Sequence, residues 1–163
     1  LGRLGRWMAG YGESLGMRVI YVDPNVESKN PKWKKVKIDQ LLKESDFISI
    51  HVHLSPETEY MFNEKTICMM KRSAYLINTS RGKIVDEKIL IKLLDKGTIA
   101  GYGTDVLDGE TSFVNSRCED HDLVRYARDN KNVMIVPHIG GMTYESRRDT
   151  DVFMANKLKN SLK

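Results

Sequence analysis

The chain has 163 residues, of which 40% are hydrophobic, and this is enough apolar surface for the core of one domain of ordinary size. No apolar run approaches the roughly 20 residues of a membrane-spanning helix, and the opening residues lack the pattern of a secretory signal, so we predict a soluble protein. The net charge is only +4, and the two cysteines show neither paired nor metal-ligand spacing, which favours a reducing compartment, the cytoplasm, without a metal site.

The first predicted element is a helix from about Leu4 to Leu15, with Gly2 and Gly5 at its head. The run Gly2-Arg3-Leu4-Gly5 matches the last four positions of G-x-G-x-x-G, in which backbone N–H groups and the helix dipole meet a pyrophosphate. The fragment alone is a weak signal. Because no strand precedes it, we expect the chain to begin inside this motif, without the first strand of a dinucleotide-binding fold.

A strand is expected next, at Met17–Val22, and Asp23 closes it. An acidic side chain at this point, eighteen residues after Gly5, can accept hydrogen bonds from the ribose hydroxyls of NAD. An aspartate before Pro24 is equally typical of a turn, and Asp23 by itself leaves both interpretations open.

Lysines are dense around Trp33, and such a cluster raises the question of an acidic partner. Pro31 interrupts any helix there, and no series of aromatic residues accompanies the lysines as stacking platforms would. We therefore favour a solvated loop over a nucleic-acid-binding surface, which stays the minor alternative.

Further strands and helices alternate along the rest of the chain. The β-rich apolar runs are Phe47–Val52, Ala74–Ile77, Ile99–Val106 and Val133–Val136. The helical patterns are Asn63 to Met70 with Asn63 as cap, Glu87 to Lys96 between Asp86 and Gly97, and Tyr144 to Leu158. This alternation predicts an α/β, Rossmann-type doubly wound parallel sheet in one domain, residues 1–163.

Polar residues follow the predicted strands. They are Asp23, then His51 and His53, then Thr79-Ser80-Arg81-Gly82, then Asp105, and then His138. Each alone fits an ordinary loop. In open α/β sheets, however, ligands bind at the carboxyl ends of the strands, so five such positions in register predict a ligand crevice.

Several segments resemble, in chain order, the signatures of the D-isomer-specific 2-hydroxyacid dehydrogenases, the phosphoglycerate dehydrogenase-like family. These segments are Leu1–Arg6, Leu15–Val19, Asn78–Asp86, Thr104–Val106 and Pro137–Gly141. The resemblance runs nearly end to end and implies an NAD-binding domain that takes part in interconverting 2-hydroxy and 2-keto acids by hydride transfer. It also implies that the substrate-binding domain of the family is absent from these residues.

The resemblance assigns catalytic roles to Arg81, Glu110 and His138. A guanidinium at Arg81 can hold the substrate carboxylate through two parallel hydrogen bonds and polarise the adjacent carbonyl. Imidazole titrates near working pH, so His138 is the acid/base, and Glu110 would fix its tautomer and favour imidazolium. Glutamate rather than glutamine at position 110 resembles hydroxyacid enzymes more than formate dehydrogenases.

The same resemblance implies the contacts with NAD. The residues concerned are Gly2, Arg3, Leu4, Gly5, Asp23, Thr58, Thr79, Ser80, Arg81, Asp105, His138, Ile139, Gly140 and Gly141. The sequence departs from the family at His53, Ser55 and Thr111, which replace a proline, a threonine and a proline; we expect His53 not to be catalytic. His121 is expected in a charged, solvated helix.

Three functional interpretations remain open. The first is an oxidoreductase that is complete only with further sequence, acting on a small 2-hydroxy or 2-keto acid, with the homodimer usual for the family as a compatible assembly. The second is an NAD-binding module resembling transcriptional corepressors of this fold, and the third is a truncated remnant. The catalytic set of Arg81, Glu110 and His138 favours the first, whereas the residues as given, lacking a substrate-binding domain, are expected to be inactive alone.

Overall fold

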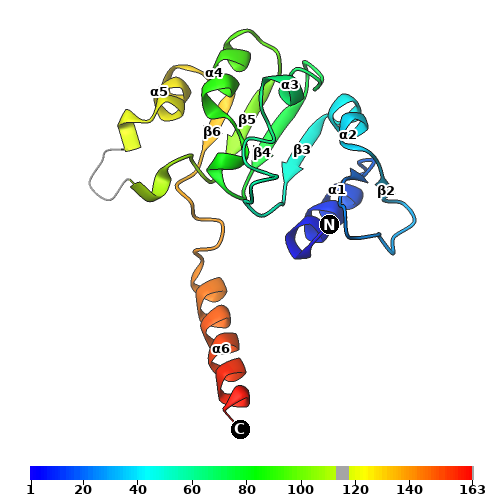
Figure 1. The fold of residues 1–163 in the computed structure, drawn as a ribbon, viewed down its shortest axis with the longest axis vertical. Helices are drawn as coiled ribbons and strands as arrows, with labels where there is room; N and C mark the ends of the chain where they lie inside the picture. Colours follow the sequence, from blue (N-terminus) through cyan, green and yellow to red (C-terminus); the bar gives the residue numbers. More distant parts are fainter. Residues whose placement is uncertain (113–117, 163) are drawn as a thin grey trace.

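A computed structural model of the protein describes residues 1–112 and 118–162. Its centre is a four-stranded parallel sheet with the strand order β3-β4-β5-β6 (Figure 1). The strands are β3 Phe47–Ile50, β4 Tyr75–Asn78, β5 Gly101–Thr104 and β6 Val133–Ile135. Consecutive strands are therefore neighbours, and each carboxyl end emerges at the same edge of the sheet.

Helices flank this sheet, and their apolar sides complete the core. They are α2 Ile38–Glu44, α3 Glu64–Ile67, α4 Glu87–Asp95 and α5 Asp122–Asp129, and the 3-10 turns are η1 Gly82–Ile84, η2 Glu110–Ser112 and η3 Cys118–Asp120. In α4 Leu90, Leu93 and Leu94 are buried and Ile89 is partly buried, and these side chains pack with Leu76 and Tyr102 of the sheet in one cluster. This parallel α/β arrangement confirms the predicted fold class.

Local sequence signals explain where the helices begin and end. The side chain of Asn63 accepts hydrogen bonds from the N–H groups of Lys65 and Thr66 and forms a capping box that starts α3. Asp86 accepts from the N–H of Ile89 at the start of α4. After α4 the chain turns at Gly97, whose φ of +65° is easily reached only by glycine. The predicted caps are confirmed, and a helix was expected near α5, whereas α2 was not predicted.

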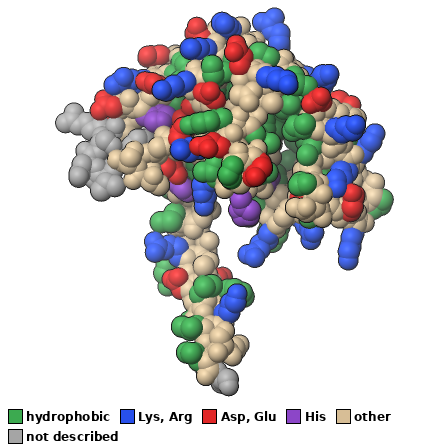
Figure 2. Space-filling model, viewed as in Figure 1, with side chains coloured by type: hydrophobic (Ala, Val, Ile, Leu, Met, Phe, Trp, Pro, Cys, Tyr) green, Lys and Arg blue, Asp and Glu red, His purple; other side chains and the backbone are tan. Residues whose placement is uncertain are grey.

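The N-terminal part holds α1 Arg3–Ser14 and a second, two-stranded parallel sheet of β1 Ile20–Tyr21 and β2 Lys34–Lys35. β1 is shorter than the predicted strand. The prediction of a loop for the lysine-rich segment was wrong at β2, because its backbone forms hydrogen bonds along β1. Lys34 N donates to Val19 O, and Val36 N donates to Tyr21 O. Figure 2 shows Lys and Arg side chains over this part of the molecule.

The last helix, α6 Tyr144–Ser161, extends away from the sheet (Figure 1). Its large apolar side chains are exposed, namely Tyr144, Val152, Phe153, Met154 and Leu158. Across the described residues we find no helix with the length and hydropathy needed to span a membrane.

Candidate active site

Polar residues gather where the parallel strands end, as predicted. Hydrogen bonds link these ends across neighbouring strands: Ser80 Oγ donates to Ile50 O at 2.8 Å, and Asp105 N donates to Asn78 O at 3.0 Å. Val136 N donates to Thr104 O at 2.9 Å and holds the approach to His138. The residues after β3, β4, β5 and β6 are therefore fixed relative to one another by the sheet itself.

Asn78 shapes the loop that carries Arg81. It is fully buried at the end of β4, where its Nδ2 donates to Arg81 O at 2.9 Å and its Oδ1 accepts from Ser80 N at 3.0 Å. Both polar ends of one amide hold this loop, and Arg81 lies at the exposed edge. Its Nη1 donates to Ser80 O at 2.6 Å, and the rest of the guanidinium can meet an anion. Our sequence interpretation gave Asn78 no role, although a polar residue closing a buried strand was a usable signal.

Asp105 anchors the loop after His138. Its Oδ1 accepts from Ile139 N and its Oδ2 from Gly140 N, both at 2.8 Å, and the residue is buried. A Cβ on Gly140 would lie 2.8 Å from Asp105 Oδ2, so this approach requires glycine. The loop therefore engages both carboxylate oxygens of Asp105. The sequence analysis did not predict this structural role and expected Asp105 only to contact NAD.

Glu110 and His138 form the centre of the candidate site. His138 Nδ1 lies 2.8 Å from Glu110 Oε1; the glutamate side chain is 21% exposed and the imidazole 49%. The other glutamate oxygen, Oε2, accepts from Leu107 N at 3.0 Å. His138 has a positive φ of 52°, which is uncommon outside glycine and concentrates at functional sites. The imidazole is thus oriented through Nδ1, and Nε2 is left for a reacting group.

The start of α1 fits an anionic ligand. Within the described residues no side chain caps this helix and its first turn holds no acidic residue, so its leading N–H groups and positive dipole end are available to a pyrophosphate. Gly5 is buried against His51, which follows β3, and a Cβ there would lie 3.6 Å from that side chain. Arg3 and Leu4 are exposed at the head of the helix.

Asp23 lies beside this glycine fragment, as the NAD-binding interpretation requires. Its Oδ2 accepts from the amino group of Leu1, and its Oδ1 accepts from the N–H groups of Asn25 and Val26 at 2.9 Å. The hydrogen bonds from these two amides hold the carboxylate of Asp23 in the turn after β1. The turn role and the position next to the glycines therefore coexist in one residue.

Thr58 has a local role in the structure. Its Oγ1 donates to His53 O at 2.6 Å and accepts from Ser55 N at 2.8 Å, which closes the turn after β3. Thr79 and Gly141 are exposed near the strand ends. Direct contact of these residues with a cofactor stays a prediction.

The expectation for His121 was wrong. Rather than lying solvated on a helix, it caps α5, and its side chain is only 15% exposed because it is packed against the buried Glu87. Sequence reasoning missed this pair, since neither residue belongs to a periodic or spaced motif.

Comparisons with known proteins identify a family for this chain. Residues 1–140 match the family model described as D-isomer specific 2-hydroxyacid dehydrogenase, NAD binding domain. The glyoxylate reductase of Thermococcus litoralis is 39% identical over 163 residues, which cover 96% of this chain and 45% of that protein. The 4-methyl-2-oxopentanoate reductase A of Aspergillus oryzae is 32% identical, with 99% and 47% covered. The chain spans about half the length of these relatives.

Solved structures give the same result. A D-isomer specific 2-hydroxyacid dehydrogenase from Lactobacillus delbrueckii ssp. bulgaricus, in an NAD complexed form, superposes with a TM-score of 0.89 at 35% identity and covers 98% of this chain and 51% of that one. A D-lactate dehydrogenase from Aquifex aeolicus, complexed with NAD and lactic acid, gives 0.84 at 36%, with 99% and 52% covered.

Proposed function

The chain belongs to the D-isomer specific 2-hydroxyacid dehydrogenases, and we propose that it is the NAD-binding domain of an enzyme that interconverts 2-hydroxy and 2-keto acids. The observation that carries the proposal is the contact between Glu110 Oε1 and His138 Nδ1 at the carboxyl ends of parallel strands. An acid/base held by a carboxylate at this edge is the arrangement that proton transfer to a carbonyl oxygen needs.

NAD fits the residues present. The uncapped start of α1 with Gly2 and Gly5 would hold the pyrophosphate, and the Asp23 carboxylate would accept from the adenosine ribose hydroxyls. When bound, the nicotinamide supplies the hydride. The protein itself binds and orients the cofactor and the substrate, and it transfers the proton.

In keto acid reduction, Arg81 binds the substrate carboxylate and polarises the neighbouring carbonyl. His138 gives its Nε2 proton to the carbonyl oxygen as C2 is reduced. Glu110 keeps Nδ1 engaged, so the ring is oriented with Nε2 available for the proton transfer. In the reverse direction His138 takes the hydroxyl proton.

The substrate is proposed to be a small 2-keto acid, with glyoxylate first, because glyoxylate reductases are prominent among the relatives. The test is NADH consumption by the full protein with glyoxylate, pyruvate, hydroxypyruvate and 4-methyl-2-oxopentanoate. Reduction of at least one acid, abolished by His138→Gln, is expected. NAD binding with no turnover of any acid would instead support the cofactor-sensing module.

Two further proposals concern the setting of the protein. Cys68 and Cys118 are exposed free thiols, which suits a reducing compartment such as the cytoplasm. The exposed apolar side chains of α6 suit burial against further protein, which includes the homodimer proposed from the family resemblance. Sedimentation of the full protein tests the dimer.

A further inference from the structure

A buried acid–base pair lies behind the candidate site, between α4 and α5. Glu87 is the first residue of α4 and only 5% exposed, and its Oε2 lies 3.2 Å from His121 Nε2. This oxygen is fully buried and receives no well-aligned hydrogen bond within residues 1–112 and 118–162, so its contact with His121 Nε2 is what offsets the loss of water. A buried carboxylate is costly to maintain, and its position therefore calls for a reason.

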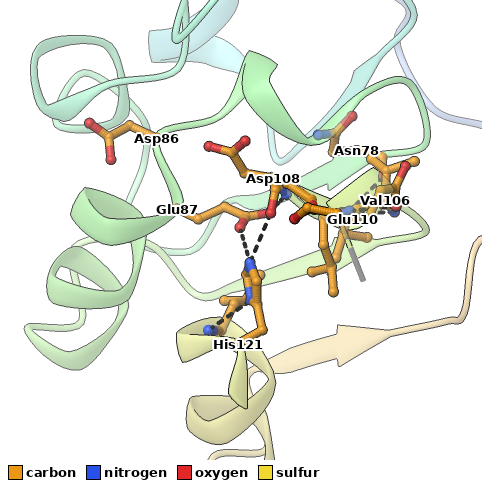
Figure 3. A network of polar contacts seen from close by, with 12 residues as sticks. Asn78, Asp86, Glu87, Val106, Asp108, Glu110 and His121 are labelled. Atoms are coloured by element: carbon orange, nitrogen blue, oxygen red, sulfur yellow. Dashed lines mark hydrogen bonds and ion pairs between the residues drawn. The ribbon is translucent and has the colours of Figure 1, made fainter. Parts of the chain in front are cut away.

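Glu87 and His121 contact the N–H and the carbonyl of Asp108, respectively. Glu87 Oε1 accepts from Asp108 N at 3.2 Å, and His121 Nε2 lies 3.2 Å from Asp108 O (Figure 3). The side chain of Asp108 is held as well, because Tyr60 Oη donates to its Oδ2 at 2.9 Å. Asp108 is thus fixed at its N–H, its carbonyl and its carboxylate by three residues from separate parts of the chain.

Asp108 stands two residues before Glu110, in the turn that Leu107 opens. Leu107 N donates to Glu110 Oε2 at 3.0 Å, and Glu110 Oε1 meets His138. Gly82 packs directly on the peptide bond between Leu107 and Asp108. A continuous series of contacts therefore runs from the buried pair, through this turn, to the proposed acid/base.

We propose that Glu87 and His121 are positioning residues that hold the Leu107–Glu110 turn and thereby keep Glu110 in contact with His138. This inference rests on the proposed function only for its catalytic consequence, because the geometric consequence can be measured without turnover.

The pair lies beside an acidic hollow of about 460 Å³. Asp86, Lys88, Asp120 and Asp122 line this hollow, together with Tyr60 and Asp108. Glu87 raises the pKa of His121, chiefly through their direct contact. Because Nδ1 accepts from Leu123 N, the ring proton lies on Nε2, which faces Glu87 and Asp108. Burial raises the pKa of Glu87, and the contact with His121 opposes that effect.

His121 has a second contact that has to be separated from this role. Its Nδ1 faces Leu123 N at 3.3 Å and caps α5. Asparagine is among the best N-cap residues but is too short to span the distance from α5 to Asp108. His121→Asn therefore keeps the cap of α5 and removes the contacts of His121 with Glu87 and Asp108.

The test compares Glu87→Gln and His121→Asn with the wild type in the full protein. Glu87→Gln keeps the shape and places either an amide donor or an uncharged oxygen against His121. The matched control is Arg125→Gln, on the same helix, whose side chain is 57% exposed and pairs only with Asp120 in the described residues. Three readouts are needed: hydrogen exchange of the peptide spanning Leu107 to Glu110, the ring-proton NMR signals of His138, and kcat with KM.

Both variants should exchange the Leu107–Glu110 amides about tenfold faster and change the His138 ring signals, while Arg125→Gln matches the wild type. With an active protein, kcat should fall about tenfold or more because small misplacements of catalytic groups are costly, and KM for NADH should change less than about twofold.

Unchanged exchange and unchanged His138 signals in folded Glu87→Gln and His121→Asn proteins would overturn the positioning role, whatever the activity. A wild type that reduces no keto acid would refute the proposed function alone, since exchange and NMR still decide on the positioning. If His121→Asn behaves as the wild type in all three readouts, His121 is only a helix cap.

Discussion

Gly82 packs so closely against Leu107 that a Cβ on the glycine would overlap the carbonyl carbon of Leu107. The two residues belong to the two loops that carry the proposed catalytic groups, since Gly82 follows Arg81 and Leu107 opens the turn to Glu110. The loop of Arg81 and the turn that leads to Glu110 are therefore in direct contact through their backbones.

This contact predicts the effect of Gly82→Ala. The methyl group would meet backbone rather than a flexible side chain, so we expect a loss of about 2 kcal/mol or more of unfolding free energy, measured by urea denaturation. Gly10→Ala is the matched control: it lies inside α1 with nothing within 4 Å of its Cβ, and it should stabilise the protein by about 0.5 to 1 kcal/mol. Equal stability of the two variants would contradict this packing.

Cofactor preference should depend on Asp23. Its carboxylate would repel the 2′-phosphate of NADP, so the wild type should bind NAD more tightly than NADP, and Asp23→Ala should reduce that ratio about tenfold or more. Calorimetric titration of both cofactors measures it, with the exposed Asp39→Ala on α2 as control. NADP binding as tight as that of NAD in the wild type would refute the ribose assignment.

Turnover should depend on the proton donor His138 and on Arg81, which binds the substrate carboxylate. In the full protein His138→Ala and Arg81→Ala should each lower kcat/KM on the order of 100-fold to 10,000-fold, while the Kd for NADH changes little. Glu110→Gln should lower kcat less, because an amide can still meet Nδ1 but carries no charge. Undiminished turnover by His138→Ala would exclude the proposed proton transfer.

Stability should fall as the pH rises through the titration of His121. Its folded pKa is raised above the ordinary value of 6.5 by Glu87, so its contribution is fully present below pH 6.5 and is lost as the pH passes the raised value. Urea midpoints between about pH 6 and pH 9 measure this, and His121→Asn should flatten the slope while Arg125→Gln should not. Parallel curves for all three proteins would exclude His121 as the group responsible.

The residues 1–163 by themselves should reduce 2-keto acids poorly. Arg81 and His138 are both exposed in this domain, and hydride transfer needs a closed site in which positioning contributes roughly 7 to 11 kcal/mol. An NADH assay on this 163-residue species, beside size-exclusion chromatography of the same sample, checks the expectation. Robust turnover would show that the domain encloses its own substrate.

Much of the site was predictable because it follows from local chemistry. Asp86 and Asn63 cap helices through bonds to N–H groups two or three residues away, and such signals survive in a linear sequence. The strands were recognisable from their apolar runs, and parallel pairing brings their carboxyl ends together. That is why the sequence pattern predicted Arg81 and His138 at the same edge of the sheet.

What the sequence did not contain is the network that joins distant segments. Glu87 and Asp108 are 21 residues apart, Asp105 and Ile139 are 34 apart, and no periodicity marks such pairs. The lysine-rich β2 also formed against expectation, because its backbone hydrogen bonds to β1 outweigh a composition that suggests a loop. The succession of the four main-sheet strands and the kinds of residue at their carboxyl ends could be read from the linear pattern. Which side chains hold the loops followed only from the folded chain, since burial and backbone pairing depend on the whole fold.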